Sequence, residues 1–386
     1  MFALLDGVRK DYAWGSTSSI PGLMGVPEDG RPWAELWFGA HSSAPATLGP
    51  SGAPLDSVIA ADPARHLGPT VHERFGELPF LVKFLAAEAP LSLQAHPSTE
   101  QACAGFDRED AAGIPVDAPH RSFRDRHHKP ELICALTDFT ALCGFRALGD
   151  TLELLGTVET SALDPIRRRL STGRRDALAV TLDHLLNLEA EEATDLVGAV
   201  VDGCRSSRAA SGRREREMAV DLATRYPGDA GVVTALLLNL VTLRPGEALF
   251  LEAGNLHAYL SGTGIEVMAN SDNVLRGGLT TKHVDVPVLL DVVDATPVEP
   301  RVQKPPVHDG VAQYDTPVPE FSLRRVEIEG SRSVLGGPAV LICTGGAVTV
   351  DGQSLPPGRA GWVSADEGRL AVAGRGTLYR VGSGLH

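Results

Sequence analysis

Residues 250–260 read FLEAGNLHAYL, and the interpretation of the whole chain starts from this stretch. An apolar run enters a Gly254-Asn255 turn, and His257 follows the turn directly. Residues 264–282, GIEVMANSDNVLRGGLTTK, then gather polar, charged and glycine residues between runs typical of buried strands. Because loops held by a rigid scaffold carry function, this composition indicates a site. A lone histidine could equally be a satisfied core residue, so His257 needs partners.

Two distant segments offer such partners. In LSLQAHP, residues 91–97, polar and apolar residues alternate with the period of a β-strand, so Gln94 and His96 share one face. In HHKPELICAL, residues 127–136, a proline marks the start of a strand that begins with Glu131. Two histidines, a carboxylate and an amide oxygen can bind a divalent ion and leave positions open for water or substrate. The alternatives are a solvent-facing polar strand for Gln94 and His96 and a turn cap for Glu131.

The length and composition bound the architecture. The chain has 386 residues, enough for two or three domains, with 43% hydrophobic and 22% charged residues. Glycine (41) and proline (27) are plentiful, which favours turn-rich β structure. We predict one β-rich domain from residues 1–148 plus 230–300, a helical insert at 149–229, and a second barrel or jelly roll at 301–386.

Within the insert, apolar residues recur at three- and four-residue spacing, which predicts helices. Residues 205–226 alternate in charge and predict one solvent-exposed helix, and the β pattern is expected to resume from Val232. The run Arg167–Arg169 is expected on an exposed helix face.

Charge and cysteine content exclude several classes. A net charge of -14 argues against nucleic-acid binding and against a polybasic membrane surface, because both need cationic patches. Five dispersed cysteines without a CxxC pair indicate reduced thiols. The longest apolar run, residues 232–241, is about half a membrane span, and the N-terminus does not resemble a signal peptide. We therefore expect a cytoplasmic protein.

Five motifs occur in an order that carries a family resemblance: Tyr12–Gly15, Ala34–His41, Leu91–Pro97, His128–Glu131 and Gly254–Lys282. Together they closely resemble the type I mannose-6-phosphate isomerases (phosphomannose isomerases), zinc enzymes of the cupin superfamily. The match spans residues 1 to about 295 except for the helical middle, and the C-terminal part agrees only in texture. The run Phe123–His127 departs from the family's Tyr-Lys-Asp-type run, and we expect little effect on activity.

The resemblance implies a mainly β fold, in which a cupin jelly-roll catalytic domain is interrupted by an α-helical domain and followed by a second jelly roll. It also implies one zinc ion per chain, and an enzyme that interconverts D-mannose 6-phosphate and D-fructose 6-phosphate. That reaction would feed GDP-mannose synthesis or mannose catabolism. The zinc ligands would be Gln94, His96, Glu131 and His257, the set proposed above from spacing.

The residues suit proton transfer through a cis-enediol, since ligands for only one metal are present. Glu266 matches an active-site carboxylate of the family and is the expected general base; the alternative is a structural carboxylate that holds Lys129 or Arg276. Arg276 aligns with the family's active-site arginine and would stabilise the enediolate or orient the sugar. Lys129 and Tyr259 match other pocket residues and would relay protons.

A phosphate dianion needs local cations in a protein of net charge -14. The candidates are Lys282, Lys83 and Ser92, although Lys83 could instead extend its ammonium group to the surface. Two other functions remain open: a cupin iron oxygenase, and a non-catalytic cupin sensor of sugar phosphates. We expect a small-molecule sugar phosphate as the only partner, with no nucleic acid, no membrane and a monomeric chain.

Overall fold

The segment that begins at His257 forms strand β12 (His257–Ala269) at the centre of an eleven-stranded sheet. In the computed structural model, which describes residues 1–385, the first part of β12 pairs with β7 (Gln94–Ala95) and β9 (Phe139–Phe145). Its second part pairs with β6 (Phe80–Ala87) and β8 (Glu131–Ala135). All four pairings are antiparallel, so one strand brings the segments around residues 94, 131 and 257 together.

Glycine allows β12 to change partners. The register of the β9 pairing shifts between Tyr259 and Ser261, just before Gly262, which has a φ of 116°. A Cβ at Gly262 would lie 2.6 Å from the carbonyl oxygen of Asp138, so a side chain would force the two strands apart. The remaining strands of this sheet are β2 (Val8–Lys10), β3 (Glu35–Gly39), β10 (Leu238–Leu243), β11 (Ala248–Leu251), β13 (Leu275–Arg276) and β14 (Val302–Gln303).

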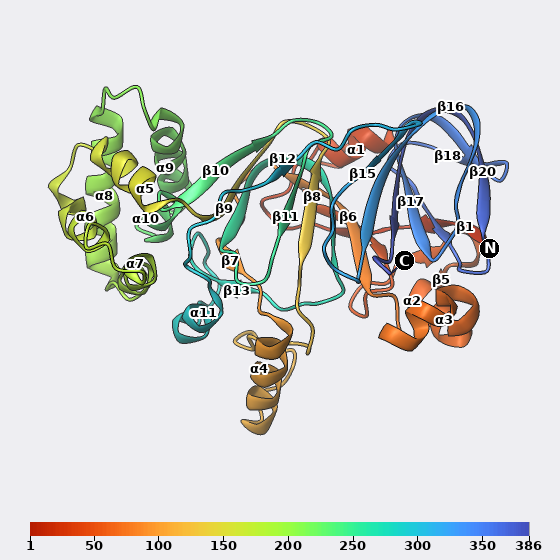
Figure 1. Ribbon diagram of the computed structural model, residues 1–386, viewed down its shortest axis with the longest axis horizontal. Helices are drawn as coiled ribbons and strands as arrows, with labels where there is room; N and C mark the ends of the chain where they lie inside the picture. The colour runs from red at the N-terminus through yellow and green to blue at the C-terminus, as the bar shows by residue number, and fades with distance from the viewer. Residues whose placement is uncertain (386) are drawn as a thin grey trace.

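A second, nine-stranded sheet is built mainly from the C-terminal part, and its strands lie at the right of Figure 1. It also contains β1, because Phe2 pairs with Val363, a pairing that the predicted domain boundaries did not anticipate. Its strands are β1 (Phe2–Asp6), β4 (Thr47–Leu48), β5 (Ala53–Pro54), β15 (Val311–Gln313), β16 (Ser322–Leu335), β17 (Ala339–Val350), β18 (Gln353–Leu355), β19 (Ala360–Val363) and β20 (Arg369–Gly382).

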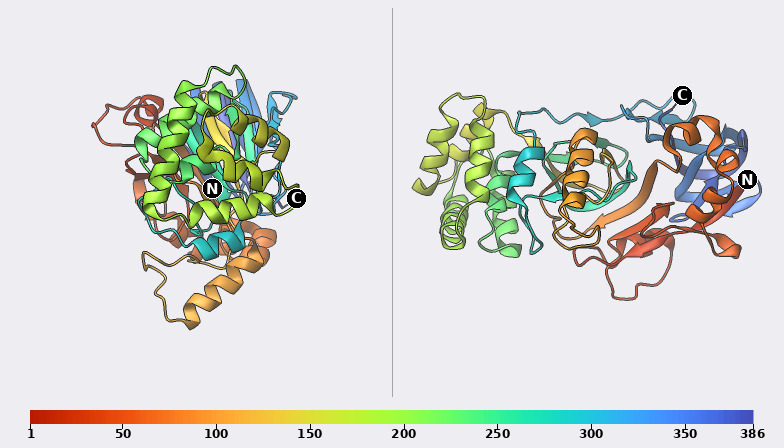
Figure 2. Two further views of the ribbon diagram at one scale, coloured as in Figure 1. Left: turned by 90° about the vertical axis from the view of Figure 1, so that its left-hand side faces the viewer. Right: turned by 90° about the horizontal axis from the view of Figure 1, so that it is seen from below.

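Six helices gather at the opposite end of the elongated molecule (Figures 1 and 2). They are α5 (Leu148–Gly156), α6 (Asp164–Leu170), α7 (Ala177–Leu186), α8 (Ala190–Ser206), α9 (Arg213–Arg225) and α10 (Gly231–Ala235). The helix predicted for residues 205–226 is confirmed as α9, but it begins only at Arg213, because α8 ends at Ser206 and Gly212 has a φ of 66°. The β pattern expected from Val232 is preceded by the short helix α10.

The other helices flank the sheets. They are α1 (Ser19–Met24), α2 (Leu55–Ala61), α3 (Pro63–Phe75), α4 (Thr99–Ala111) and α11 (Val286–Val292), with 3-10 turns at Gly49–Ser51 and Ser161–Leu163. Helix α4 was not predicted, although the sequence contains the pattern of a capping box. The Ser98 hydroxyl accepts a hydrogen bond from the Gln101 N–H, and the Gln101 side chain accepts one from the Ser98 N–H. No helix within residues 1–385 combines the length and apolarity needed to cross a membrane.

The two sheets share one hydrophobic core. Phe84 of β6 belongs to the same buried cluster as Trp362 of β19 and Tyr379 of β20. Phe84 is fully buried and meets Phe38 edge-to-face with ring centroids 5.9 Å apart. The eleven-stranded sheet is therefore stabilised by packing against the nine-stranded sheet.

Truncating Phe84 tests this shared core. We expect Phe84→Ala to lower the free energy of unfolding by about 3–5 kcal/mol, since the lost aromatic ring leaves a cavity between well-packed layers. Urea-induced unfolding would measure the change. Val180→Ala is the control, because Val180 is 41% exposed and its truncation should change stability by less than about 0.5 kcal/mol. Equal effects of the two substitutions would contradict the shared core.

Candidate metal centre and active site

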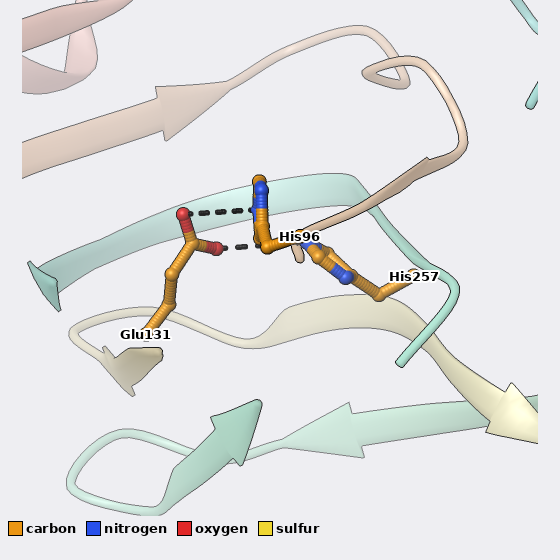
Figure 3. A group of neighbouring side chains, drawn as sticks. All are labelled: His96, Glu131 and His257. Carbon is orange, nitrogen blue, oxygen red and sulfur yellow. Dashed lines mark ion pairs between the residues drawn. The ribbon is translucent and has the colours of Figure 1, made fainter. Parts of the chain in front are cut away.

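Three of the four predicted metal ligands meet in the structure (Figure 3). Nε2 of His96 lies 3.3 Å from Oε1 of Glu131, and Nε2 of His257 lies 3.5 Å from Oε2 of the same carboxylate. The candidate ligand atoms are all within 4.8 Å of one another, and all three residues are buried. The solvent-facing strand and the turn cap considered for these residues are wrong.

Hydrogen bonds fix both imidazoles in the tautomer that a metal requires. Nδ1 of His96 lies 2.7 Å from the carbonyl oxygen of Asn273, and Nδ1 of His257 lies 2.9 Å from that of Asn255. A carbonyl oxygen only accepts, so each Nδ1 carries the proton and each Nε2 keeps its lone pair. Within residues 1–385, both Nε2 atoms and Oε2 of Glu131 lack hydrogen-bond partners. Such buried unsatisfied atoms fit a metal ion that would bind them.

The electrostatics of the three side chains agree with this interpretation. Burial lowers the pKa of His96 to about 4, although the Glu131 charge opposes the change, so the ring is neutral near pH 7. Burial alone would raise the pKa of Glu131, but the favourable electrostatic surroundings of the carboxylate, including the charge of Lys129, hold it well below its usual range. Neutral imidazoles and an ionised carboxylate are the protonation states that bind a divalent cation.

Gln94, the fourth predicted ligand, lies in β7 directly opposite His257. It lines a cavity of about 530 Å³, which Glu131 also lines. Gln94 as a metal ligand stays a prediction. The same cavity is lined by all the other predicted catalytic and phosphate-binding residues: Lys83, Ser92, Lys129, Tyr259, Glu266, Arg276 and Lys282. A volume in this range accommodates a small ligand.

Glu266 is buried deep in this cavity and is paired with Lys83. Nζ of Lys83 lies 2.6 Å from Oε2 of Glu266 and 2.9 Å from Oε1 of Glu35. Burial raises the pKa of the Glu266 carboxyl; Lys83 opposes this shift, and the charges of Glu131 and Glu35 add to it. The partner considered for Glu266 was Lys129 or Arg276, but Lys83 takes that place. Its position also excludes the alternative of a Lys83 ammonium group extended to the surface.

Lys129 and Tyr259 approach the same region. Nζ of Lys129 lies 3.6 Å from Oε1 of Glu131. The Tyr259 hydroxyl is buried and has no hydrogen-bond partner among the residues that the structure describes. Burial, with the charges of Glu266 and Glu131, raises the pKa of Tyr259 well above its usual value, so this residue carries a neutral hydroxyl. Both groups can exchange protons with a ligand oxygen in the cavity.

Arg276, Lys282 and Arg124 are three of the cationic residues that line the cavity. Burial and the Arg124 charge lower the pKa of Arg276. Burial lowers the pKa of Lys282 as well, with both arginines adding to the shift. None of the three forms an ion pair within the part of the chain that the structure describes. Clustered cations without carboxylate partners are suited to binding an anion.

Two residues of this region were not predicted to belong to the site. Arg124 was expected to lie outside the ligand set, yet it lines the cavity, and the expectation of little effect on activity stays a prediction. Asn273 is fully buried; its side chain accepts from the Arg124 and Asp125 N–H groups, and its carbonyl oxygen orients His96. The readable signals were a basic residue near the His-Lys-Pro-Glu motif and a polar run at residues 270–273.

Comparison with known proteins gives one consistent result. The profile described as "Phosphomannose isomerase type I, catalytic domain" matches residues 1–148. The mannose-6-phosphate isomerase of Salmonella typhimurium is 38% identical over 395 residues, covering 99% of both chains. The human mannose-6-phosphate isomerase is 34% identical over 362 residues, covering 83% of this chain and 81% of the human chain.

Solved structures agree. A crystal structure of mannose 6-phosphate isomerase with bound zinc superimposes with a TM-score of 0.91 and 36% identity, covering 100% of both chains. The apo form from Salmonella typhimurium gives a TM-score of 0.92 at 36% identity. With the motifs, the metal-ligand geometry and full-length relatives in agreement, this chain belongs to the type I phosphomannose isomerase family.

Proposed function

We propose that this chain is a zinc-dependent enzyme that interconverts D-mannose 6-phosphate and D-fructose 6-phosphate. The observation that carries the proposal is a buried His96–Glu131–His257 group beside a cavity that also holds a buried carboxylate and unpaired cations. The full-length relatives reported above are mannose-6-phosphate isomerases, and they give no support to a non-catalytic sensor or an iron oxygenase.

The zinc ion would be held by His96, Glu131 and His257, with Gln94 as the fourth ligand. When bound, zinc supplies a Lewis acid that polarises the sugar carbonyl and lowers the energy of an enediolate. The fixed tautomers of the two histidines prepare this site before the ion arrives.

Glu266 would act as the general base. It would take the proton from C2 of the open-chain aldose, giving a cis-enediol, and return that proton to C1 of the ketose. The hydroxyl proton on O2 must leave as the O1 oxygen gains one, and Lys129 and Tyr259 would relay these protons. The same groups would protonate the ring oxygen during ring opening. Arg276 would orient the sugar and stabilise the enediolate.

The phosphate would bind at Lys282 and Ser92, with Arg124 as an additional cation. Lys83 was also predicted for this role, but its ammonium group lies between two carboxylates. We therefore propose that Lys83 serves Glu266 and that the cations without carboxylate partners take the dianion. A local cluster of this kind outweighs the net charge of -14 at short range.

The finer organisation follows the same proposal. Residues 1–148 with 230–300 would form a cupin jelly-roll catalytic domain, 149–229 a helical domain, and 301–386 a second jelly roll completed by β1. The two sheets and the terminal group of helices support this division. We further propose a monomeric cytoplasmic enzyme with one zinc ion per chain and no nucleic-acid or membrane partner. It would feed GDP-mannose synthesis or mannose catabolism.

Metal removal tests the activity directly. Chelator-stripped protein should not convert mannose 6-phosphate to fructose 6-phosphate, and added zinc should restore turnover. At the same low zinc concentration, His257→Ala should bind less than about a tenth as much zinc as the wild type, because the substitution removes a direct metal ligand. Mass spectrometry of metal content and a coupled assay would measure both. Zinc-loaded wild-type protein without turnover would refute the proposed reaction.

The pH profile tests the base. Because only the carboxylate accepts a proton, kcat/KM should rise with pH through the pKa of Glu266, which lies above the ordinary value of 4.5. Glu266→Gln should lower kcat by about 100-fold or more and abolish this acid limb. Glu252→Gln, at an exposed glutamate, should keep the wild-type profile. An unchanged acid limb in Glu266→Gln would assign the base elsewhere.

Substrate affinity tests the phosphate site. Lys282→Ala should raise KM for mannose 6-phosphate about tenfold or more, because a hydrogen bond to a charged group contributes roughly 1.5–3 kcal/mol. Lys304→Ala is the matched control, since its side chain is 78% exposed and lies away from the cavity lining. Initial-rate kinetics would separate the two variants. Equal KM values would move the phosphate site away from Lys282.

A further inference from the structure

Glu35 is a buried carboxylate that the mechanism has not yet used. It begins β3, and Trp37 lies two residues further along the same face. Trp37 is paired in register with Lys83 of β6, and Lys83 with Glu266 of β12. Three neighbouring strands therefore present Glu35, Lys83 and Glu266 on one face of the sheet, and all three side chains line the same cavity.

Both oxygens of Glu35 are engaged. Oε1 accepts from the Lys83 ammonium group at 2.9 Å, and Oε2 accepts from Nε1 of Trp37 at 2.8 Å. Glu35 is 5% exposed and Trp37 is 7% exposed, so water does not compete for these bonds. The Trp37 ring is itself packed beneath the Lys10 ammonium group, 4.3 Å from the ring centroid. Glu35 is thus held in one position and in turn holds Lys83.

Of Glu35, Lys83 and Glu266, only Glu266 changes its charge during the proposed reaction. When Glu266 accepts a proton it becomes neutral, and without Glu35 the Lys83 side chain would then be a buried cation without a counter-ion. A buried charge without a partner is costly, so an isolated Lys83 would move or lose its proton. Glu35 removes this problem because its own carboxylate stays beside the ammonium group throughout the cycle.

We propose that Glu35 is a positioning residue for the isomerase reaction, which keeps Lys83 fixed and charged beside Glu266 while Glu266 gains and loses a proton. The inference rests on the proposed function. It assigns Glu35 no contact with the substrate: Glu35 acts through Lys83, and Trp37 acts through Glu35.

The test is Glu35→Gln in the zinc-loaded enzyme. A Gln amide offers one acceptor oxygen where Glu35 serves two donors, so it leaves either Lys83 or Trp37 unpaired. We expect kcat for mannose 6-phosphate to fall about tenfold or more, with KM and zinc content close to wild-type values. Substrate deuterated at C2 should give a primary isotope effect on kcat in this variant, because the loss lies in proton transfer.

Companion variants make the result decisive. Glu35→Asp keeps the charge and should recover part of the kcat lost in Glu35→Gln. Glu73→Gln, at an exposed glutamate of α3, should match the wild type. If Glu35→Gln yields no folded protein, Trp37→Phe decides on the same criteria, since it removes only the donor to Oε2 and keeps an aromatic ring.

Three results would overturn the inference. Wild-type kcat in Glu35→Gln would show that the counter-ion is dispensable. A lower kcat without an isotope effect, or a loss confined to KM and zinc content, would locate the defect in structure or binding. Wild-type enzyme that binds zinc but does not turn over mannose 6-phosphate would overturn the proposed function together with this inference, and so is distinguishable from the first two.

Discussion

The burial of three carboxylates around one cavity is the constraint on which the rest of this molecule depends. Glu35, Glu131 and Glu266 are all almost fully buried, and a buried charge must be paired or coordinated. Lys83 is shared between Glu35 and Glu266, whereas Glu131 faces two imidazoles whose free lone pairs can bind a metal cation. The site is therefore an arrangement of charges that is complete only when a divalent ion is present.

The scaffold supplies this arrangement through one strand. β12 carries His257 where it pairs with β7 and β9, and Glu266 where it pairs with β6 and β8. The change of partners needs the glycine at position 262, and the C-terminal sheet packs against the other face of β6. His257 and Glu266, the proposed metal ligand and the proposed base, are consequently held on one rigid element, which keeps their mutual distance fixed.

The sequence predicted the family and the grouping of His96, Glu131 and His257, because these residues lie in long motifs with local patterns. It did not predict the partnerships of two other pairs of distant residues. Glu35 and Lys83 are 48 residues apart, and Arg124 and Asn273 are 149 apart, so no local pattern links them. Helices α4 and α10 were missed because short apolar or polar runs fit either a strand or a helix, and tertiary packing decides between them.

The pairing of Phe2 with Val363 also bears on how the chain is made. Strand β1 is synthesised long before its neighbour β19, so the nine-stranded sheet cannot close until β19 has been made. Contacts of such large sequence separation form late and slowly, because the entropy of closing the intervening loop must be overcome first. Until β19 has been made, the edge of β1 that pairs with it is exposed. Other molecules around the nascent chain would have to protect this edge from aggregation.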